Sequence, residues 1–139
     1  MFLLDTNVLS AMMTAAPEAE VAAWTSQQPI ETLFTASLCQ AEILAGLAIM
    51  PEGRRRQELV EAARSMFAED FDGRVLPFDG AAATVYAELY AVRRRGGRST
   101  ATVDLMIAAI AKTQVASIAT RNVTDFEECG VPIINPWST

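Results

Sequence analysis

Histidine is absent from the 139-residue sequence, and the chain has only two cysteines and one lysine. Without histidine it cannot build a Ser-His-Asp triad, a Cys-His dyad or a histidine-ligated metal site. Cys39 and Cys129 are too few for a cysteine-built zinc site. So few thiols, with no export signal, predict a cytoplasmic location. Any chemistry must therefore use carboxylates, hydroxyls, amides, arginines or Lys112.

Long apolar runs are also lacking. None approaches the roughly 18 residues that suggest a membrane span, and Met1 to Asp5 lack the basic segment of a signal peptide. We therefore expect no membrane partner. An apolar fraction of 51% and a charged fraction of 20% exclude a disordered chain. The length predicts a single domain over residues 1–139.

The net charge of −6 argues against a strongly basic nucleic-acid binder. Ten of the eleven basic residues are nevertheless arginine, and six of them form the triplets Arg54–Arg56 and Arg93–Arg95. Such clusters can form a local basic track on an acidic chain. Arg93–Arg95 precede Gly96-Gly97, where cations stabilise a helix C-terminus. For Arg93–Arg95 we give equal weight to this structural role and to contact with an RNA backbone.

Short apolar runs alternate with helical patterns along the chain. Strands are predicted at 2–4, 33–36, 75–78, 117–120 and 133–134, and helices at 8–13, 17–28, 37–49, 54–69, 79–95 and 102–115. Ser37, Asp79 and Thr102 are expected to cap helices, and Pro77 places its strand at a sheet edge. The alternation predicts an α/β fold with a central, short-stranded parallel sheet.

Three carboxylates interrupt apolar segments: Asp5 ends a strand, Glu42 lies within an apolar helix, and Asp104 lies at the head of another. A carboxylate in such a place is costly unless it is paired or binds a metal. Each also has a structural explanation. Asp5 can cap a helix, Asp104 can face a helix dipole, and Glu42 can pair with a buried arginine.

The predicted topology brings most of these acids to one edge. Ligands of open parallel sheets bind at the carboxyl ends of the strands. Asp5 and Thr120 end strands there, and the helix bearing Glu42 begins there. Asp104 is the exception, because a helix that enters a strand is expected to begin at the opposite edge unless it is tilted or offset.

Clustered carboxylates repel, and a divalent cation removes that penalty. An all-oxygen ligand set selects Mg²⁺ or Mn²⁺ over Zn²⁺ or Cu²⁺. Such a site can activate water and offset charge at a phosphoryl group, which suits phosphodiester hydrolysis. Arg121, in a polar segment beside the proposed metal site, is the strongest candidate for holding an RNA phosphate.

Four segments, in order, resemble the motifs of PIN-domain proteins. They are Leu3–Ser10, Ser37–Ile43 with Gly46, Asp104–Ala109 and Thr120–Phe126. The closing Ile134-Asn135-Pro136-Trp137 is similar to the branch that includes plasmid-stability and VapC-type toxins.

This resemblance implies a three-layer α/β/α fold and a Mg²⁺- or Mn²⁺-dependent endoribonuclease, the toxin of a toxin–antitoxin pair. It implies that Asp5, Glu42, Asp104 and Asp125 are the catalytic, metal-binding acids. Asn7 is a supporting residue, and Asn122 or Thr120 is an alternative to Asp125 or shares its role. RNA, a cognate antitoxin and a second copy of the chain, with a higher assembly around the antitoxin, are the expected partners.

Two other functions compete with this interpretation. A haloacid-dehalogenase-like phosphatase also starts with a hydrophobic strand and an aspartate, but it needs a second acid where this chain has Asn7. A catalytically silent binding or regulatory module is the other alternative, and the presence of all four acids argues against it.

Overall fold

Five short strands form one parallel sheet in the order β3-β2-β1-β4-β5 in the computed structural model, which describes residues 1–99 and 101–138. The strands are β1 (Phe2–Leu4), β2 (Leu33–Ala36), β3 (Val75–Leu76), β4 (Ser117–Ala119) and β5 (Ile133–Ile134). β1 lies at the centre, with Leu3 opposite Phe34 on one side and Ile118 on the other. Leu3 and Ile118 are fully buried. Burial on both faces explains why these strands are continuous apolar runs.

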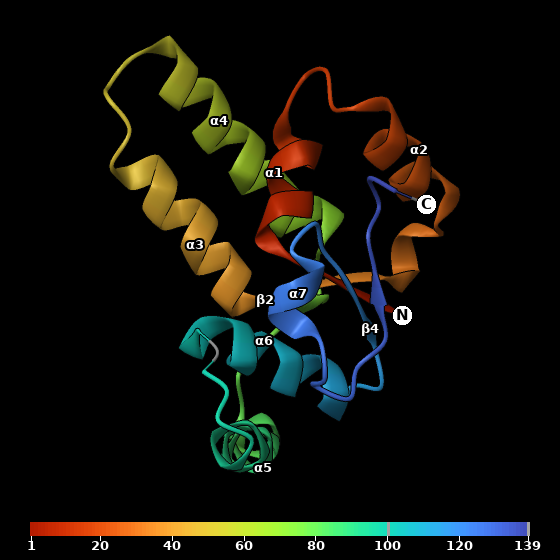
Figure 1. The fold of residues 1–139 in the computed structure, drawn as a ribbon. Helices are drawn as coiled ribbons and strands as arrows, with labels where there is room; N and C mark the ends of the chain where they lie inside the picture. Colours follow the sequence, from red (N-terminus) through yellow and green to blue (C-terminus); the bar gives the residue numbers. More distant parts are fainter. Residues whose placement is uncertain (100, 139) are drawn as a thin grey trace.

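Helices cover the sheet on both faces (Figure 1), which makes the fold the three-layer α/β/α arrangement that was predicted. They are α1 (Thr6–Met13), α2 (Ala19–Gln27), α3 (Ser37–Ala48), α4 (Arg54–Ser65), α5 (Gly80–Arg95), α6 (Thr102–Thr113) and α7 (Val123–Phe126), with the short η1 (Ile30–Thr32) and the π-helical η2 (Met66–Asp70). Helices α1 to α4 pack together, whereas α5 packs on α6 and α6 on α7. Among the described residues, no helix combines the length and the apolar character needed to cross a bilayer.

The strand order creates a topological switch point between β1 and β4. The chain moves outward from β1 through β2 to β3, then crosses back to β4 on the other side of β1. Ligands of open α/β sheets bind at the carboxyl edge of the strands beside such a point. The Asp5 N–H donates to the Ala119 carbonyl at 3.0 Å. The first predicted acid therefore lies at the switch point.

The N-cap residues of the observed helices match those predicted from the sequence only in part. Asp79 caps α5 as expected, and its Oδ1 accepts from the Ala82 N–H at 2.9 Å. The expected caps Ser37 and Thr102 are wrong, because each is already the first residue of its helix and the cap positions are Ala36 and Ala101. β2 runs directly into α3, so the last strand residue occupies the extended cap position and leaves no turn for Ser37.

Several element ends also differ from the sequence prediction. β3 is shorter than predicted and stops before Pro77, although it does lie at the sheet edge. The helix predicted over 54–69 does extend that far, but only as far as Ser65 as the α-helix α4, because it continues over Met66–Asp70 as the π-helical η2. Ile133–Ile134 forms the predicted fifth strand.

The Asp79 cap gives a direct test of how α5 is held. Replacing Asp79 with alanine removes the acceptor for one of the free N–H groups in the first turn, so the free energy of unfolding should fall by about 1 kcal/mol. Chemical denaturation measures this change. Glu88→Ala, an exposed substitution within the same helix, should leave stability nearly unchanged, and an equal loss in both variants would contradict the cap.

Candidate active site

Asp5 follows β1 and has only 5% of its surface exposed. Its Oδ1 accepts a hydrogen bond from the Thr6 N–H at 2.8 Å, which caps α1. Its Oδ2 accepts one from the Thr120 hydroxyl at 2.8 Å, which ties the end of β1 to the end of β4. Burial raises the pKa of Asp5, both hydrogen bonds lower it, and the nearby Asp125 raises it further. The capping role and a place in the acid cluster are thus compatible.

Asn7 connects Asp5 to the loop after β4. Its Nδ2 lies 3.3 Å from the Thr120 hydroxyl and 3.5 Å from Asp5 Oδ2, and its Oδ1 accepts from the Arg121 N–H at 3.1 Å. The Thr120 hydroxyl also accepts from the Asn122 N–H at 3.0 Å. The three residues predicted to support the site therefore form one network around Asp5. An amide suits Asn7 because this position must both donate and accept.

Glu42 lies on α3 with its side chain exposed. The expectation that an apolar helix would enclose it is wrong, because its neighbours Ala41 and Leu44 face solvent as well. The ion pair with a buried arginine is also wrong for the described residues, since no cationic side chain there pairs with Glu42. Partial loss of solvent and the charge of Asp5 raise its pKa, and the nearby Thr6 lowers it.

Asp104 lies in the first turn of α6 and is partly buried. Burial, followed by the charges of Asp5, Asp125 and Glu42, raises its pKa to about 6. Asp104 thus lies near the other acids, as the motif resemblance implies, and not at the opposite edge that the order of strands and helices alone suggested. α6 runs antiparallel to the strand that follows it, so its first turn lies at the carboxyl edge and its last turn lies where β4 begins.

A sharp turn at Val115 makes this reversal possible. Its φ of +54° lies in the left-handed region, which is unfavourable for a β-branched residue. The Ala116 N–H donates back to the Ala111 carbonyl at 2.9 Å as the chain turns into β4.

Charge interactions connect all four predicted acids. Asp125 lies in the first turn of α7 and raises the pKa of both Asp5 and Asp104. Glu42 and Asp5 act on Asp104 in the same direction. In the described part of the chain, none of the four forms an ion pair with lysine or arginine. The fold thus brings four carboxylates from β1, α3, α6 and α7 to one edge without a compensating side chain.

This arrangement fits a hydrated, hard cation. Within residues 1–99 and 101–138, no three acidic or thiol side chains are close enough to hold one ion directly. Mg²⁺ usually takes only one or two protein carboxylates and keeps several waters, so the donor chemistry suits it. The buried Thr6 hydroxyl has no hydrogen-bond partner among the described groups. It was not predicted as a site residue, and only its place next to Asp5 indicates it.

A groove of about 310 Å³ adjoins the acids between α1, α3 and α4. Its lining residues are Thr6, Ser10, Met13, Thr14, Glu42, Ile43, Gly46, Leu47, Arg55 and Leu59. Most of this surface is apolar, with Glu42 at the end near the acids and Arg55 contributed by α4.

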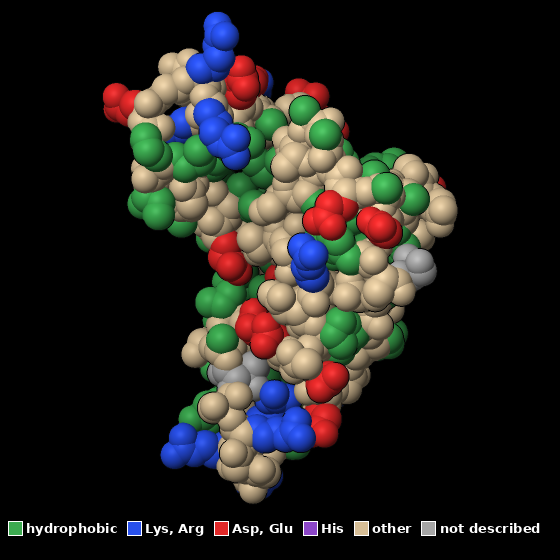
Figure 2. All heavy atoms as spheres, turned by 45° about the horizontal axis from the view of Figure 1, so that its top comes forward, with side chains coloured by type: hydrophobic (Ala, Val, Ile, Leu, Met, Phe, Trp, Pro, Cys, Tyr) green, Lys and Arg blue, Asp and Glu red, His purple; other side chains and the backbone are tan. Residues whose placement is uncertain are grey.

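The arginine triplets divide between structural and exposed positions. Arg93 is buried, and its Nη1 donates to the Glu127 carbonyl at 2.8 Å. Arg56 donates to the Leu47 carbonyl at 2.9 Å and so stabilises the end of α3. The other arginines of both triplets are exposed. Figure 2 shows basic side chains gathered at two ends of one face, over the start of α4 and over the end of α5, with several acidic side chains between them.

Arg121 follows β4 and projects from the edge of the site. Its guanidinium lies 5.0 Å from the centre of the Trp137 ring and 3.6 Å from a Glu18 carboxylate oxygen, and 56% of the side chain is exposed. A half-exposed guanidinium stacked on an indole keeps several donors free for a phosphate.

The sequence pattern of the family described as PIN domain matches residues 2–130. The chain belongs to the PIN-domain family. Among PIN-domain relatives, it is 42% identical over 137 residues to "Plasmid stability protein StbB" of Pseudomonas syringae pv. tomato, covering 99% of both chains. It is 41% identical over 137 residues to "VapC ribonuclease Y4jK" of Sinorhizobium fredii, covering 99% of this chain and 98% of the relative.

The same PIN-domain fold is found in a solved structure described as "FitAcB from Neisseria gonorrhoeae". It superposes with a TM-score of 0.93 at 33% identity and covers 100% of both chains. The fold predicted from the sequence motifs is therefore confirmed over the whole chain.

The raised pKa of Asp104 predicts a specific pH dependence. Between pH 3.8 and about 6 the folded carboxyl retains a proton that the unfolded chain has released, so this group's contribution to stability is lost as pH rises through that window. Because Asp104 is partly exposed, we expect a loss of about 1 kcal/mol. Asp104→Asn should remove it and stabilise the metal-free protein at pH 7.

Denaturation curves measured from pH 4 to pH 8 in the presence of EDTA give the comparison. The exposed Asp72→Asn serves as the matched control and should follow the wild type. Parallel curves for the wild type and Asp104→Asn would show that the environment does not raise this pKa.

Proposed function

We propose that the chain is a Mg²⁺- or Mn²⁺-dependent endoribonuclease and the toxin of a toxin–antitoxin pair. The observation that carries the proposal is the convergence of Asp5, Glu42, Asp104 and Asp125 at the switch point with no cationic partner in the described chain. Membership in the PIN-domain family, and relatives named as a VapC ribonuclease and the toxin FitB, support the reaction class.

Asp5 and one or two of the other three acids would hold the cation directly, with waters between the ion and the remaining carboxylates. When bound, the cation would supply an activated water and offset charge at the scissile phosphate. Asp5 is the best positioned of them, because Thr6 and Thr120 fix its two oxygens. Asn7 stabilises Thr120 and the backbone at Arg121 through its amide. Asp104 has a pKa of about 6 in the metal-free protein, so near that pH its carboxyl can hold or release a proton.

An antitoxin is the proposed protein partner. Solved structures at 33% identity are described as FitAcB and as FitAB bound to DNA. In this chain, the apolar groove beside Glu42 suits one face of an amphipathic helix. An arginine of the partner could enter the acidic site with bidentate carboxylate contacts. We further propose a homodimer as the toxin unit, with a larger assembly around the antitoxin.

Charge-removing substitutions test the nuclease. Asp5→Asn and Asp104→Asn keep the side-chain shape but remove a ligand charge, so each should lower the rate of RNA cleavage by about 100-fold or more. Asp72→Asn, an exposed acid outside the cluster, should cleave like the wild type. Treatment with EDTA should stop cleavage, and Mg²⁺ or Mn²⁺ should restore it.

Cleavage rates at saturating RNA and melting temperatures distinguish lost chemistry from lost folding. Wild-type rates in Asp5→Asn, or cleavage that survives exhaustive chelation, would contradict the proposed mechanism.

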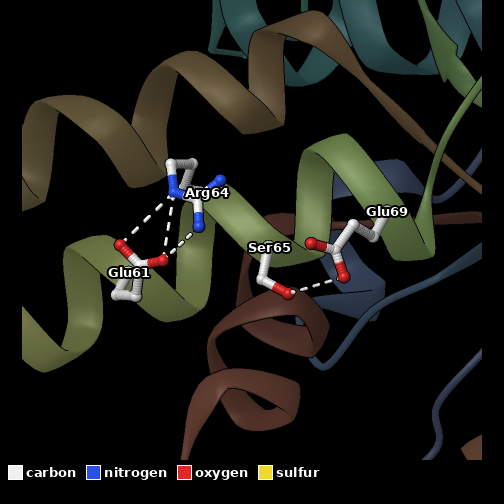
Figure 3. Close-up of polar contacts among 4 residues, drawn as sticks. All are labelled: Glu61, Arg64, Ser65 and Glu69. Atoms are coloured by element: carbon white, nitrogen blue, oxygen red, sulfur yellow. Dashed lines mark hydrogen bonds and ion pairs between the residues drawn. The ribbon is translucent and has the colours of Figure 1, made fainter.

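Arg121 should contribute to RNA binding by holding one phosphate. In a cleavage-deficient Asp5→Asn background, Arg121→Ala should weaken the binding of single-stranded RNA and reduce the salt slope by about 0.7, the amount expected for one phosphate. Arg64→Ala is a matched control, since 61% of the Arg64 side chain is exposed. Figure 3 shows Arg64 paired with Glu61 on α4, with Nε–oxygen distances of 3.1 and 3.3 Å.

Binding constants measured over a series of salt concentrations provide the slopes. The control should match the wild type. Equal slopes for the wild type and Arg121→Ala would assign Arg121 to the fold or to the antitoxin surface instead.

A further inference from the structure

We infer that the end of α5 carries a subsite for single-stranded RNA, in which Tyr90 stacks on a nucleobase and Arg94 and Arg98 hold the adjoining phosphate. The inference rests on the proposed ribonuclease function and deepens it. It concerns a surface that the four acids and Arg121 do not include.

One face of α5 forms an aromatic and basic stripe. Tyr86, Tyr90 and Arg94 follow one another at intervals of four residues, which places them on the same side of the helix. The rings of Tyr86 and Tyr90 are stacked with centroids 6.2 Å apart and an interplanar angle of 22°. Phe78 packs against this stripe, with the edge-to-face contact between its ring and that of Tyr86 having a centroid separation of 6.1 Å. Aromatic rings next to arginines are the usual platform for single-stranded nucleic acid.

Tyr90 is the exposed member of this stack, with 48% of its surface accessible. Its hydroxyl lies 3.5 Å from Arg94 Nη1, and Tyr86 packs against its ring. Two neighbours therefore restrict its orientation while much of the side chain still faces solvent. A large exposed aromatic side chain that is already ordered can stack on a base with little loss of conformational freedom.

The end of α5 directs Arg98 back toward the same place. The Arg98 N–H donates to the Arg93 carbonyl at 2.9 Å and the Gly97 N–H to the Arg94 carbonyl at 3.1 Å, which is the hydrogen-bond pattern of a Schellman motif. Gly97 has a φ of +72°, a conformation that favours glycine. The Gly96-Gly97 pair thus does more than stop the helix, because it turns Arg98 toward Arg94.

A pocket of about 110 Å³ lies at this turn. Tyr90, Arg93, Arg94, Arg98, Ser99 and Leu105 line it. It is larger than the about 30 Å³ occupied by one water and well below the several hundred Å³ of a typical small-molecule site, so it suits a single phosphate group. Arg93 is nine-tenths buried here, and its Nε has no hydrogen-bond partner among the described groups. Three guanidinium groups around so small a space favour an anion.

The pocket is close to the proposed reaction centre. Leu105 lines it and directly follows Asp104 on α6, and α5 packs extensively on α6. Arg98 is paired at the surface with Glu128, with oxygen distances of 2.8 and 3.0 Å. Exposed ion pairs of this kind are weak, so a phosphate can replace the carboxylate. The basic end over α5 in Figure 2 would then bind RNA that the neighbouring acids alone would repel.

Binding of a fluorescein-labelled oligouridine, measured in the full-length Asp5→Asn protein over a range of salt concentrations, tests the subsite. Tyr90→Leu should weaken binding by about tenfold, whereas Tyr90→Phe, which keeps the stacking surface, should stay within about twofold of the parent. Arg94→Ala combined with Arg98→Ala should reduce the salt slope by about 0.7 for each phosphate that the two arginines neutralise. Arg64→Ala should match the parent in both respects.

Photo-crosslinking with a 5-iodouridine RNA provides a second readout that does not depend on variants. We expect the crosslink on the α5 peptide that contains Tyr90. Crosslinks confined to other segments, or parent-like binding by Tyr90→Leu and the double arginine variant, would overturn the subsite. A change in oligomeric state with unchanged RNA affinity would also overturn it and would assign the face to contact between copies.

The outcomes for the subsite and for the proposed function are separable. Suppose that the wild-type protein cleaves RNA in the presence of Mn²⁺. If the subsite substitutions, made in this active protein and not in Asp5→Asn, leave KM unchanged, the subsite fails and the nuclease stands. If the wild type does not cleave but RNA binding depends on Tyr90 as described, the subsite stands and the nuclease fails.

Discussion

Mutual repulsion among four carboxylates is the constraint on which the rest of this structure depends. Asp5 is nearly buried, and Asp104 has a pKa raised to about 6 by burial and by the other three acids. A cluster arranged only for stability would contain an arginine or a lysine, yet the described chain pairs none with these acids. The fold maintains an unfavourable concentration of negative charge, which is the expected cost of a site that binds a cation.

The parallel sheet brings these negative charges together, and threonine and asparagine side chains stabilise the arrangement through hydrogen bonds. Because β1 and β4 are neighbours across the switch point, the residues that follow them meet at one edge. Thr120 donates to Asp5, and Asn7 connects both of them to the Arg121 backbone. Neutral donors can position a carboxylate without neutralising it, so this network orients Asp5 while leaving its charge available. The exposed arginines of the two triplets lie at the ends of this face, whereas Arg121 projects from the edge of the site itself.

The sequence predicted the strands and the α/β class, because short apolar runs and their flanking polar residues are local signals. The full set of four acids, Asp125 included, came from the resemblance to the PIN-domain motifs. The sequence did not predict properties that depend on packing. The exposure of Glu42 follows from which face of α3 meets the sheet, and the burial of Arg93 follows from its contact with the Glu127 carbonyl. Ser37 and Thr102 have suitable cap chemistry but already lie within their helices. The predicted topology alone did not place Asp104 with the other acids, whereas the motif resemblance did, because the reversal of the chain at Val115 that sets the direction of α6 is not a local sequence signal.

The most direct test of the cation site is a crystal structure of the protein grown with Mn²⁺, with the ion located by anomalous scattering. The account predicts a peak at the switch point, bound by Asp5 and at least one of Glu42, Asp104 and Asp125, with waters completing the coordination. A protein saturated with Mn²⁺ elsewhere and showing no peak beside Asp5 would contradict it. The carboxylates would then have to be explained as features of the fold alone.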